Sequence, residues 1–239
     1  MKIAIIGYGK MGKEIEKIAL ERGHEVPLKI TSKNTADFNT ENLKQVDVAI
    51  EFSNPELALN NINKCLDAKT PIVIGTTGWY DSFEEVKNKV DNTNGSLLYA
   101  TNCSIGVNIF FKVNEILAQM MNKLPDYKVA IEEIHHTQKL DAPSGTAITL
   151  AEGIIDNLSL KNGWVNEKSD IENELAILSK REENVPGTHQ ITYSSPIDEI
   201  EIKHTAHSRK GFALGAVVAA EYIHNKKGIF TMNDVLFTN

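Results

Sequence analysis

The sequence predicts an α/β protein, in which a parallel sheet covered by helices is followed by a smaller α+β domain with a mixed sheet. Two observations predict the first part: short apolar runs alternate with segments of helical periodicity, and a glycine-rich turn follows the first run. A third observation predicts the second part, because later strands follow one another without intervening helices. The length of 239 residues accommodates both, since a domain typically takes ~100–200 residues.

Apolar runs typical of buried parallel strands occur at Lys2–Ile6, Val26–Ile30, Val46–Phe52, Pro71–Ile74 and Leu97–Ala100. Pro27 weakens the second strand or gives it an irregular start, because proline cannot donate to a ladder. Helices are expected between the strands, with Met11, Ile15, Ile18 and Ala19 on one face of the first, Pro55 in the first turn of another, and a polar helix near Ser82–Asn92. This alternation predicts the parallel sheet.

The pattern changes after Ser104. The expected elements are a long helix at Val107–Met121, a strand at Tyr127–Ile134, a helix at Ser144–Ile155 with Ser144 as N-cap, strands at Leu175–Ser179, His189–Tyr193 and Glu199–His204, and helices at Phe212–Ile223 and Thr231–Phe237. Strict alternation in Glu199–Lys203 predicts one buried face and one wet or paired face. We expect the last helices to return to the first domain, so that residues 1–104 and 209–239 form one domain and residues 105–208 the other.

Composition narrows the class of protein. The apolar fraction of 41% and charged fraction of 24% are typical of a globular chain, and no run of about 18 apolar residues predicts a membrane span. The net charge of −7 without a basic cluster argues against nucleic acid as a partner. Cys65 and Cys103 have no metal-ligand spacing, and they favour reduced thiols in a cytoplasm. We therefore expect a cytoplasmic protein with no nucleic-acid or membrane partner.

A dinucleotide-binding motif, Gly7-Tyr8-Gly9-Lys10-Met11-Gly12, directly follows the first strand and opens the first helix. Such glycines permit a tight turn and close approach of a pyrophosphate, which the helix N-terminus attracts through its free N–H groups and dipole. This context predicts a Rossmann-type domain in which all six residues contact the coenzyme. The alternative is a glycine turn that serves only strand–helix packing.

The motif lacks the acidic residue that usually binds the ribose about 20 residues further on. Thr31, Ser32 and Lys33 lie there instead, close to Lys29, and the next acid is Asp37. Hydroxyls with a lysine suit a 2′-phosphate better than a bare diol, so we expect NADPH to be used and preferred, with NADH as the other coenzyme. A solvated strand end without a role is the alternative.

Two further loops follow strands and are expected near a nicotinamide, because ligands cross the carboxyl ends of the strands in such sheets. One contains Gly75, Thr76 and Thr77, and the other contains Ala100, Thr101, Asn102 and Cys103. Either could be an ordinary loop, but their position favours coenzyme binding.

The densest group of reactive side chains is Glu132-Glu133-Ile134-His135-His136-Thr137-Gln138-Lys139-Leu140-Asp141-Ala142-Pro143-Ser144-Gly145-Thr146-Ala147. Adjacent histidines on a strand point to opposite faces, so His135 and His136 make a poor chelate and we expect no metal. Acid–base chemistry by one histidine beside Lys139 is favoured, near an anion held at a helix start by Gly145 and Thr146. A polar surface loop is the alternative.

The motif His135-His136-x-x-Lys139-x-Asp141-Ala142-Pro143-Ser144-Gly145-Thr146-Ala147 resembles that of the dihydrodipicolinate (4-hydroxy-tetrahydrodipicolinate) reductases, enzymes of the diaminopimelate route to lysine. The resemblance spans nearly the whole chain. Its other blocks are Glu51-Phe52-Ser53-x-Pro55, Gly75-Thr76-Thr77-Gly78, Asn102-Cys103-Ser104-Ile105-Gly106-Val107-Asn108 and His204-x-x-His207-Ser208-Arg209-x-x-Phe212-Ala213-x-Gly215-Ala216.

The resemblance implies specific roles. His135 matches the proton donor and acceptor, Lys139 the catalytic lysine, and His136, Gly145 and Thr146 the groups that bind the substrate, whereas the role of Arg209 stays open. The substrate would be a cyclic imine with two carboxylates, which loses its hydroxyl as water and is reduced by NADPH or NADH. The first domain would bind the dinucleotide, and the second would bind substrate and form a homotetramer through its sheet.

The chain also departs from the family. Its glycine motif is one residue shorter than the common spacing, and Thr137 and Gln138 replace Arg and His in the middle of the histidine motif. Two other functions remain open: another aspartate-pathway dehydrogenase, for which Cys103 is a candidate nucleophile, and a dinucleotide-sensing module without turnover.

Overall fold

The computed structural model describes residues 1–238 and divides into two compact units. Unit 1 comprises Met1–Ile105 together with the chain from Arg209 onward, and unit 2 comprises Gly106–Ser208. Among the described residues, no helix is long and apolar enough to span a bilayer.

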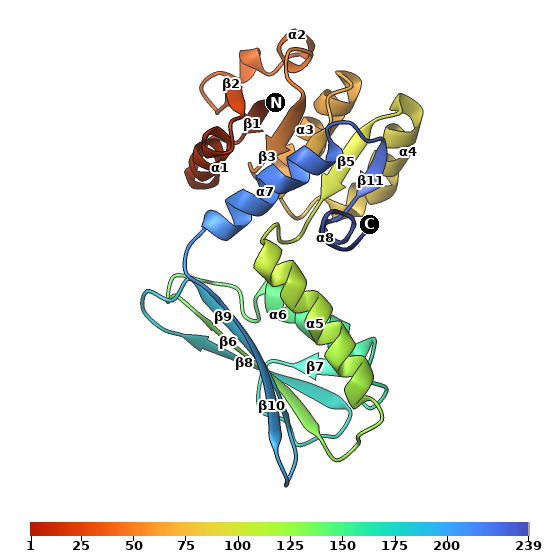
Figure 1. Ribbon diagram of the computed structural model, residues 1–239. Coiled ribbons are helices and arrows are strands. Elements are labelled where there is room, and N and C mark those ends of the chain that lie inside the picture. The colour runs from red at the N-terminus through yellow and green to blue at the C-terminus, as the bar shows by residue number, and fades with distance from the viewer. Residues whose placement is uncertain (239) are drawn as a thin grey trace. The chain divides into compact units, whose positions relative to one another are not determined.

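Unit 1 is built on a six-stranded sheet in the order β11-β5-β4-β3-β1-β2, and every neighbouring pair is parallel (Figure 1). Its strands are β1 (Lys2–Ile6), β2 (Glu25–Ile30), β3 (Val48–Glu51), β4 (Ile72–Ile74), β5 (Ser96–Tyr99) and β11 (Gly228–Phe230). Its helices are α1 (Lys10–Glu21), α2 (Thr40–Leu43), α3 (Pro55–Asp67), α4 (Phe83–Thr93), α7 (Lys210–Ile223) and α8 (Met232–Phe237), with short 3₁₀ turns at Thr35–Asp37 and Tyr80–Ser82. The expected α/β class is confirmed.

Helices cover both faces of this sheet, which explains why its strands are continuous apolar runs. On one face, α1 and the Ala-rich α7 pack against β1 and β3, with Ile15, Ala216 and Ala220 fully buried. On the other face, α3 packs against β3 and β4 and α4 packs against β11, with Ile62 and Val86 fully buried. The carboxyl ends of the strands are therefore held together at one edge of the sheet, where the candidate coenzyme loops begin.

Unit 2 contains a five-stranded mixed sheet in the order β10-β9-β6-β8-β7. Its strands are β6 (Lys128–His135), β7 (Gly163–Val165), β8 (Glu174–Arg181), β9 (Gly187–Ser194) and β10 (Glu199–Ala206), and its helices are α5 (Ile105–Met121) and α6 (Gly145–Ile155). β6 is parallel to β8 and antiparallel to β9. Both helices pack on one face of the sheet, around Ile131, Ile177 and Tyr193 (Figure 1).

Two expectations about strands need comment. Pro27 does give β2 an irregular start, since the register with β1 shifts between Lys2 and Ala4, and β2 is an edge strand, where proline is tolerated. The expectation of a buried face along Glu199–Lys203 is wrong, because Ile200 on that face is 37% exposed. β10 is the edge strand of its sheet, so fewer neighbours cover it.

Candidate active site

The glycine motif of unit 1 lies between β1 and α1, and its glycines meet different surroundings. Gly7 has φ +91°, and a Cβ there would lie 2.1 Å from the carbonyl oxygen of Phe52. A Cβ on Gly12 would lie 2.5 Å from the carbonyl oxygen of Gly7. A Cβ on Gly9, by contrast, would meet nothing within 4 Å. Packing therefore requires Gly7 and Gly12, whereas Gly9 leaves open space of the kind an approaching phosphate needs.

The backbone N–H groups of the glycine motif also fall into two groups: some are hydrogen-bonded within the protein, and others remain available to a ligand. The N–H groups of Gly7 and Tyr8 both donate to the carbonyl of Ile30 at 3.1 Å, which fixes the turn to the end of β2. Gly9 is the N-cap of α1 and makes no side-chain cap hydrogen bond. Because the first N–H groups of a helix have no intrahelical acceptor, those of Lys10 and Met11 remain suited to an anion. Gly7 and Tyr8 can shape such a site but cannot offer it these N–H groups.

The structure reduces the number of residues that are available to contact a 2′-phosphate. The Nζ of Lys29 lies 2.9 Å from the Oε1 of Glu16, and the Oε2 of Glu16 accepts a hydrogen bond from the hydroxyl of Tyr8. The hydroxyl of Thr31 donates to the Oδ1 of Asn34 at 2.7 Å. Lys29 and Thr31 are thus already engaged, whereas Ser32 and Lys33 have exposed side chains. Ser32 and Lys33 are the stronger candidates for contact with the ribose or its phosphate.

The loops after β4 and β5 present some of their residues and bury others. A Cβ on Gly75 would lie 2.2 Å from the ring of Phe52, so a larger residue there would require that ring to move. Thr76 is buried and its hydroxyl accepts a hydrogen bond from the N–H of Ser53 at 2.9 Å, whereas Thr77 and Thr101 are exposed.

Cys103 in the second of these loops is buried beneath α7. A Cβ on Gly215 would lie 1.7 Å from the carbonyl oxygen of Cys103. Burial raises the pKa of the Cys103 thiol to about 12. A thiol with so little thiolate is a poor nucleophile at neutral pH.

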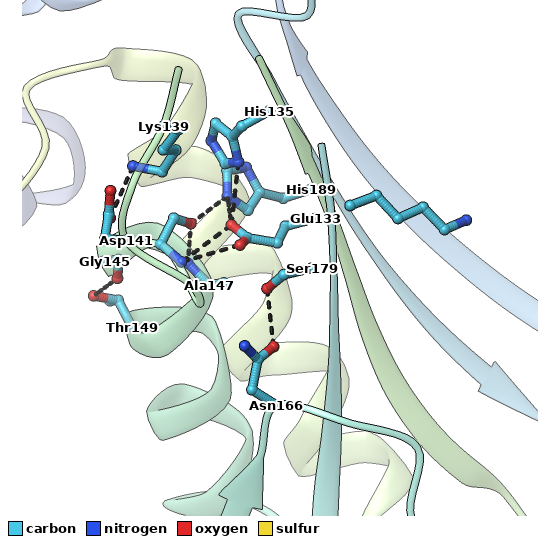
Figure 2. A network of polar contacts seen from close by, with 12 residues as sticks. Glu133, His135, Lys139, Asp141, Gly145, Ala147, Thr149, Asn166, Ser179 and His189 are labelled. Carbon is cyan, nitrogen blue, oxygen red and sulfur yellow. Dashed lines mark hydrogen bonds and ion pairs between the residues drawn. The ribbon is translucent and has the colours of Figure 1, made fainter. Parts of the chain in front are cut away.

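The histidine motif of unit 2 begins at the end of β6. Side chains two residues apart on a strand share a face, so Glu133 and His135 point the same way (Figure 2). Glu133 is fully buried. Its carboxylate accepts hydrogen bonds from the N–H of Ser144 at 3.1 and 3.2 Å, and Arg181 donates to its Oε1 at 3.4 and 3.5 Å.

His135 and His189 approach the same carboxylate from two strands. The Nδ1 of His135 lies 3.2 Å from the Oε2 of Glu133, and the Nε2 of His189 lies 3.6 Å from that oxygen. The two imidazole rings are 5.0 Å apart and nearly perpendicular. A Cβ on Gly187 would lie 3.0 Å from the Nε2 of His135. The absence of a side chain at this position of β9 therefore keeps the space beside that nitrogen open.

His136 follows the strand, is half-buried, and accepts the N–H of Lys139 on its carbonyl at 3.1 Å. Its ring does not belong to the buried cluster. The three side chains that do gather, Glu133, His135 and His189, offer ligand atoms within 4.8 Å of one another. The Arg181 guanidinium and the Ser144 N–H already satisfy this carboxylate, so we interpret the group as a hydrogen-bonded cluster rather than a metal site.

Burial and hydrogen bonding act in opposite directions on these groups. Burial disfavours the charged carboxylate, yet the contacts with the imidazoles of His135 and His189 and the hydrogen bond from Ser144 hold the pKa of Glu133 well below its usual range. Burial lowers the pKa of His189, and the contact with Glu133 only partly offsets this effect. At neutral pH, Glu133 is therefore a carboxylate and the imidazole of His189 beside it is neutral.

Lys139 lies on the loop between β6 and α6, where its Nζ contacts the Oδ2 of Asp141 at 2.9 Å (Figure 2). The hydrogen bond from Lys139 lowers the pKa of Asp141. Arg181 fastens this loop, since it donates to the carbonyls of Asp141 at 2.6 Å and of Lys139 at 3.4 Å. The ammonium of Lys139 is thus held near the cluster on a loop pinned from β8.

The loop ends at the start of α6. Ser144 is the N-cap, as expected, and its hydroxyl accepts the N–H of Ala147 at 3.2 Å. The same hydroxyl lies 3.0 Å from the Nε2 of His189. Gly145 is exposed and a Cβ there would meet nothing within 4 Å, so the first turn of the helix leaves room beside it.

Sequence reasoning missed the roles of Glu133, Arg181 and His189. The alternation of β6 could have placed Glu133 beside His135, because residues two apart share a face. Arg181 and His189 reach the cluster from β8 and β9, and no local pattern in the sequence pairs those strands with β6.

A parallel sheet whose first strand leads into a glycine turn is typical of enzymes that bind a dinucleotide. Together with a second unit that carries a buried cluster of a carboxylate and two imidazoles, it is typical of two-domain oxidoreductases that use such a coenzyme. Family models described as dihydrodipicolinate reductase match residues 1–103 with the N-terminal model and residues 106–236 with the C-terminal model. The chain belongs to the dihydrodipicolinate reductase family.

Individual relatives agree. The chain is 52% identical over 238 residues to a 4-hydroxy-tetrahydrodipicolinate reductase of Christiangramia forsetii, covering 99% of this chain and 98% of that one. It is 33% identical over 233 residues to the enzyme of the same description from Neisseria meningitidis, covering 94% and 84%. A solved structure of a dipicolinate-bound dihydrodipicolinate reductase from Paenisporosarcina sp. TG-14 superposes with a TM-score of 0.79 at 25% identity, covering 97% of each chain.

Proposed function

We infer that this chain is a reductase that converts 4-hydroxy-tetrahydrodipicolinate to tetrahydrodipicolinate with NADPH or NADH, in the diaminopimelate pathway of lysine biosynthesis. The observation that carries the proposal is His135 at the end of β6, backed by the buried Glu133 and followed by the pinned Lys139 loop. The 52% identity over nearly the whole chain to a reductase of that description supports the same substrate.

The chemistry assigns a role to each residue type. The substrate loses its hydroxyl as water, and bound coenzyme supplies a hydride to the ring. His135 donates the proton that completes the reduction, since an imidazole exchanges protons readily at neutral pH. Lys139 presents a positive charge to a substrate carboxylate or to charge developing at the ring nitrogen. His136 and the N–H groups of Gly145 and Thr146 at the start of α6 bind the carboxylates.

Coenzyme binding is proposed for the carboxyl edge of the sheet in unit 1. The first turn of α1 holds the pyrophosphate, with Gly9 leaving space and with Lys10 and Met11 supplying N–H groups. Ser32 and Lys33 contact the ribose 2′ position, and this basic, hydroxyl-bearing turn favours NADPH. The exposed Thr77 and Thr101 lie on the loops proposed for the nicotinamide.

We also propose a cytoplasmic homotetramer formed through the sheet of unit 2. α5 and α6 cover one face of that sheet, whereas side chains on its other face are half-buried, among them Ala130, Leu178 and Thr192. A second copy would cover these side chains. Light scattering coupled to gel filtration measures the mass directly, and a monomer would contradict the proposal.

The experiment that tests the function is a coupled assay. A separate synthase condenses aspartate semialdehyde with pyruvate, and purified protein is added with NADPH or NADH. Oxidation that depends on the synthase is the expected result, with the faster rate for NADPH. If folded protein binds the coenzymes but oxidises neither, the reductase assignment is wrong and a dinucleotide-sensing module is left. Equal or greater efficiency with NADH would contradict only the coenzyme preference.

The competing dehydrogenase with a cysteine nucleophile makes a different prediction. Cys103 is 2% exposed and its pKa is raised to about 12, so a thiol reagent should react slowly and Cys103→Ser should retain activity. Loss of turnover in Cys103→Ser, in protein that remains folded, would instead favour the alternative.

A further inference from the structure

We propose that Glu133 is the positioning residue of the acid–base histidine, holding the imidazole of His135 with its Nδ1–H toward the carboxylate so that Nε2 is the atom that transfers the proton. The inference rests on the proposed function, in which His135 is the proton donor. It adds a residue with which that histidine must act.

The contact is built into β6. Glu133 and His135 lie two residues apart and on the same face, which places the Nδ1 of His135 3.2 Å from the Oε2 of Glu133. Among the described residues Nδ1 makes no well-aligned hydrogen bond, so Glu133 is the acceptor within reach. Such contacts are often poorly aligned in unliganded enzymes and tighten when substrate binds.

Glu133 itself is held from three other elements and cannot turn away. Arg181 contacts it from β8, the N–H of Ser144 donates to it from the loop before α6, and His189 approaches it from β9. The carboxylate is fully buried, so water does not compete for its oxygens. A carboxylate fixed in this way sets both the orientation and the tautomer of the imidazole beside it.

The charge of Glu133 matters as well as its geometry. The groups that face it are His135 on its own strand, Arg181, His189 and Ser144, and Lys139 lies on the loop that Arg181 pins. An ionised carboxylate has no proton to donate, so it requires the Nδ1 of His135 that faces it to be the donor. A neutral amide would keep the size of the side chain but remove this requirement.

The test compares Glu133→Gln with Glu132→Gln. Glu132 is the adjacent carboxylate on the opposite face of β6, paired with Lys180 at 2.6 Å, which makes it a matched control. We expect Glu133→Gln to lower kcat by about 10²–10⁴-fold with little change in KM, as when the carboxylate behind a catalytic imidazole is lost. Glu132→Gln should match the wild type in both kcat and KM.

A second measurement requires neither turnover nor a folded Glu133→Gln variant. Nitrogen-15 NMR of the imidazoles in wild-type protein, assigned by loss of one signal in His135→Ala, should show neutral His135 protonated at Nδ1. Protonation at Nε2, or kinetics of folded Glu133→Gln equal to those of Glu132→Gln, would overturn the proposal. If the wild type lacks reductase activity, the proposed function fails, whereas the tautomer still decides whether Glu133 orients His135.

Discussion

Gly7 and Gly9 are separated by one residue, yet a methyl group would have opposite consequences at the two positions. At Gly7 it would meet the backbone of Phe52 at a φ of +91°, which side chains rarely adopt, whereas at Gly9 it would enter open space. Gly7 is therefore needed for the turn to fold, whereas Gly9 is needed for a ligand to approach it.

We therefore expect Gly9→Ala to leave the unfolding midpoint unchanged and to weaken coenzyme binding by about tenfold, the equivalent of roughly 1.4 kcal/mol. Gly7→Ala should instead lower the midpoint in urea, because it adds backbone strain of about 1–2 kcal/mol to a steric clash. Urea unfolding and coenzyme titration by fluorescence measure the two effects. Equal effects of both substitutions on coenzyme binding and stability would contradict this division.

His135 and Lys139 carry the proposed chemistry, and substitution should affect turnover far more than folding. We expect His135→Ala and Lys139→Ala each to lower kcat about 10²–10⁴-fold, the usual contribution of an acid–base group. Gln138→Ala, an exposed position in the same loop, is the control. Steady-state rates in the coupled assay test the prediction, and near-wild-type turnover in either variant would remove that residue from the mechanism.

Some residues around the buried cluster can be predicted from the sequence, and others cannot. His135 and Lys139 belong to a contiguous motif, and Ser144 has the residue type and position of an N-cap. Arg181 and His189 lie more than forty residues further along the chain from the histidine motif's start, and only the pairing of β6 with β8 and β9 brings them in.

Among the elements, α6 shows how one residue links a helix start to the cluster. The hydroxyl of Ser144 caps the helix through the N–H of Ala147 and contacts His189. Without it, both the first turn of α6 and a buried imidazole lose a partner.

We expect Ser144→Ala to destabilise the protein by about 1–2 kcal/mol, the upper part of the range for an N-cap, because two contacts are lost. Thr149→Ala is the matched control, since its hydroxyl only donates to the carbonyl of Gly145 on an exposed part of the same helix. Urea denaturation compares the two variants, and equal destabilisation would show that the cap contributes nothing beyond an exposed hydroxyl.

The elements found from the sequence are those with enough length to show a period. The helices at Pro55–Asp67 and Lys210–Ile223 and the strand at Lys128–His135 are of this kind. β7 and β11 have three residues each, too few to display alternation, and β11 joins its sheet through β5, a strand far earlier in the sequence. The exposure of β10 depends on its place at the sheet edge, which the alternation of its residues does not specify.

For the whole molecule, the buried cluster predicts sensitivity to acid. Burial keeps the pKa of His189 below its value in the unfolded chain, near ~6.5, so its contribution to stability is present above that pH and is lost as pH falls. The pKa of Glu133 is also depressed, because the contacts with His135, His189 and Ser144 outweigh burial. Its contribution is lost as pH falls below about 4.3, the value in the unfolded chain.

The free energy of unfolding should therefore decrease in two stages between about pH 7.5 and pH 2, with His189 responsible for the first stage and Glu133 for the second, below about pH 4.3. Urea unfolding at a series of pH values measures this profile. His189→Gln should flatten the first stage and Glu133→Gln the second. A wild-type stability that does not change over this range would contradict the argument.

The two ends of the chain build one unit, since α7, β11 and α8 join the sheet begun by Met1–Ile105. On the ribosome the amino-terminal part therefore emerges with one face of its sheet covered by α1 but not by α7, and with β5 as an open edge. Both conditions persist until the intervening 106–208 segment has been synthesised. That segment is contiguous and can collapse first. Translation thus allows unit 2 to be completed before unit 1, and the open β5 edge makes the nascent chain most prone to aggregation before the segment from Arg209 onward appears.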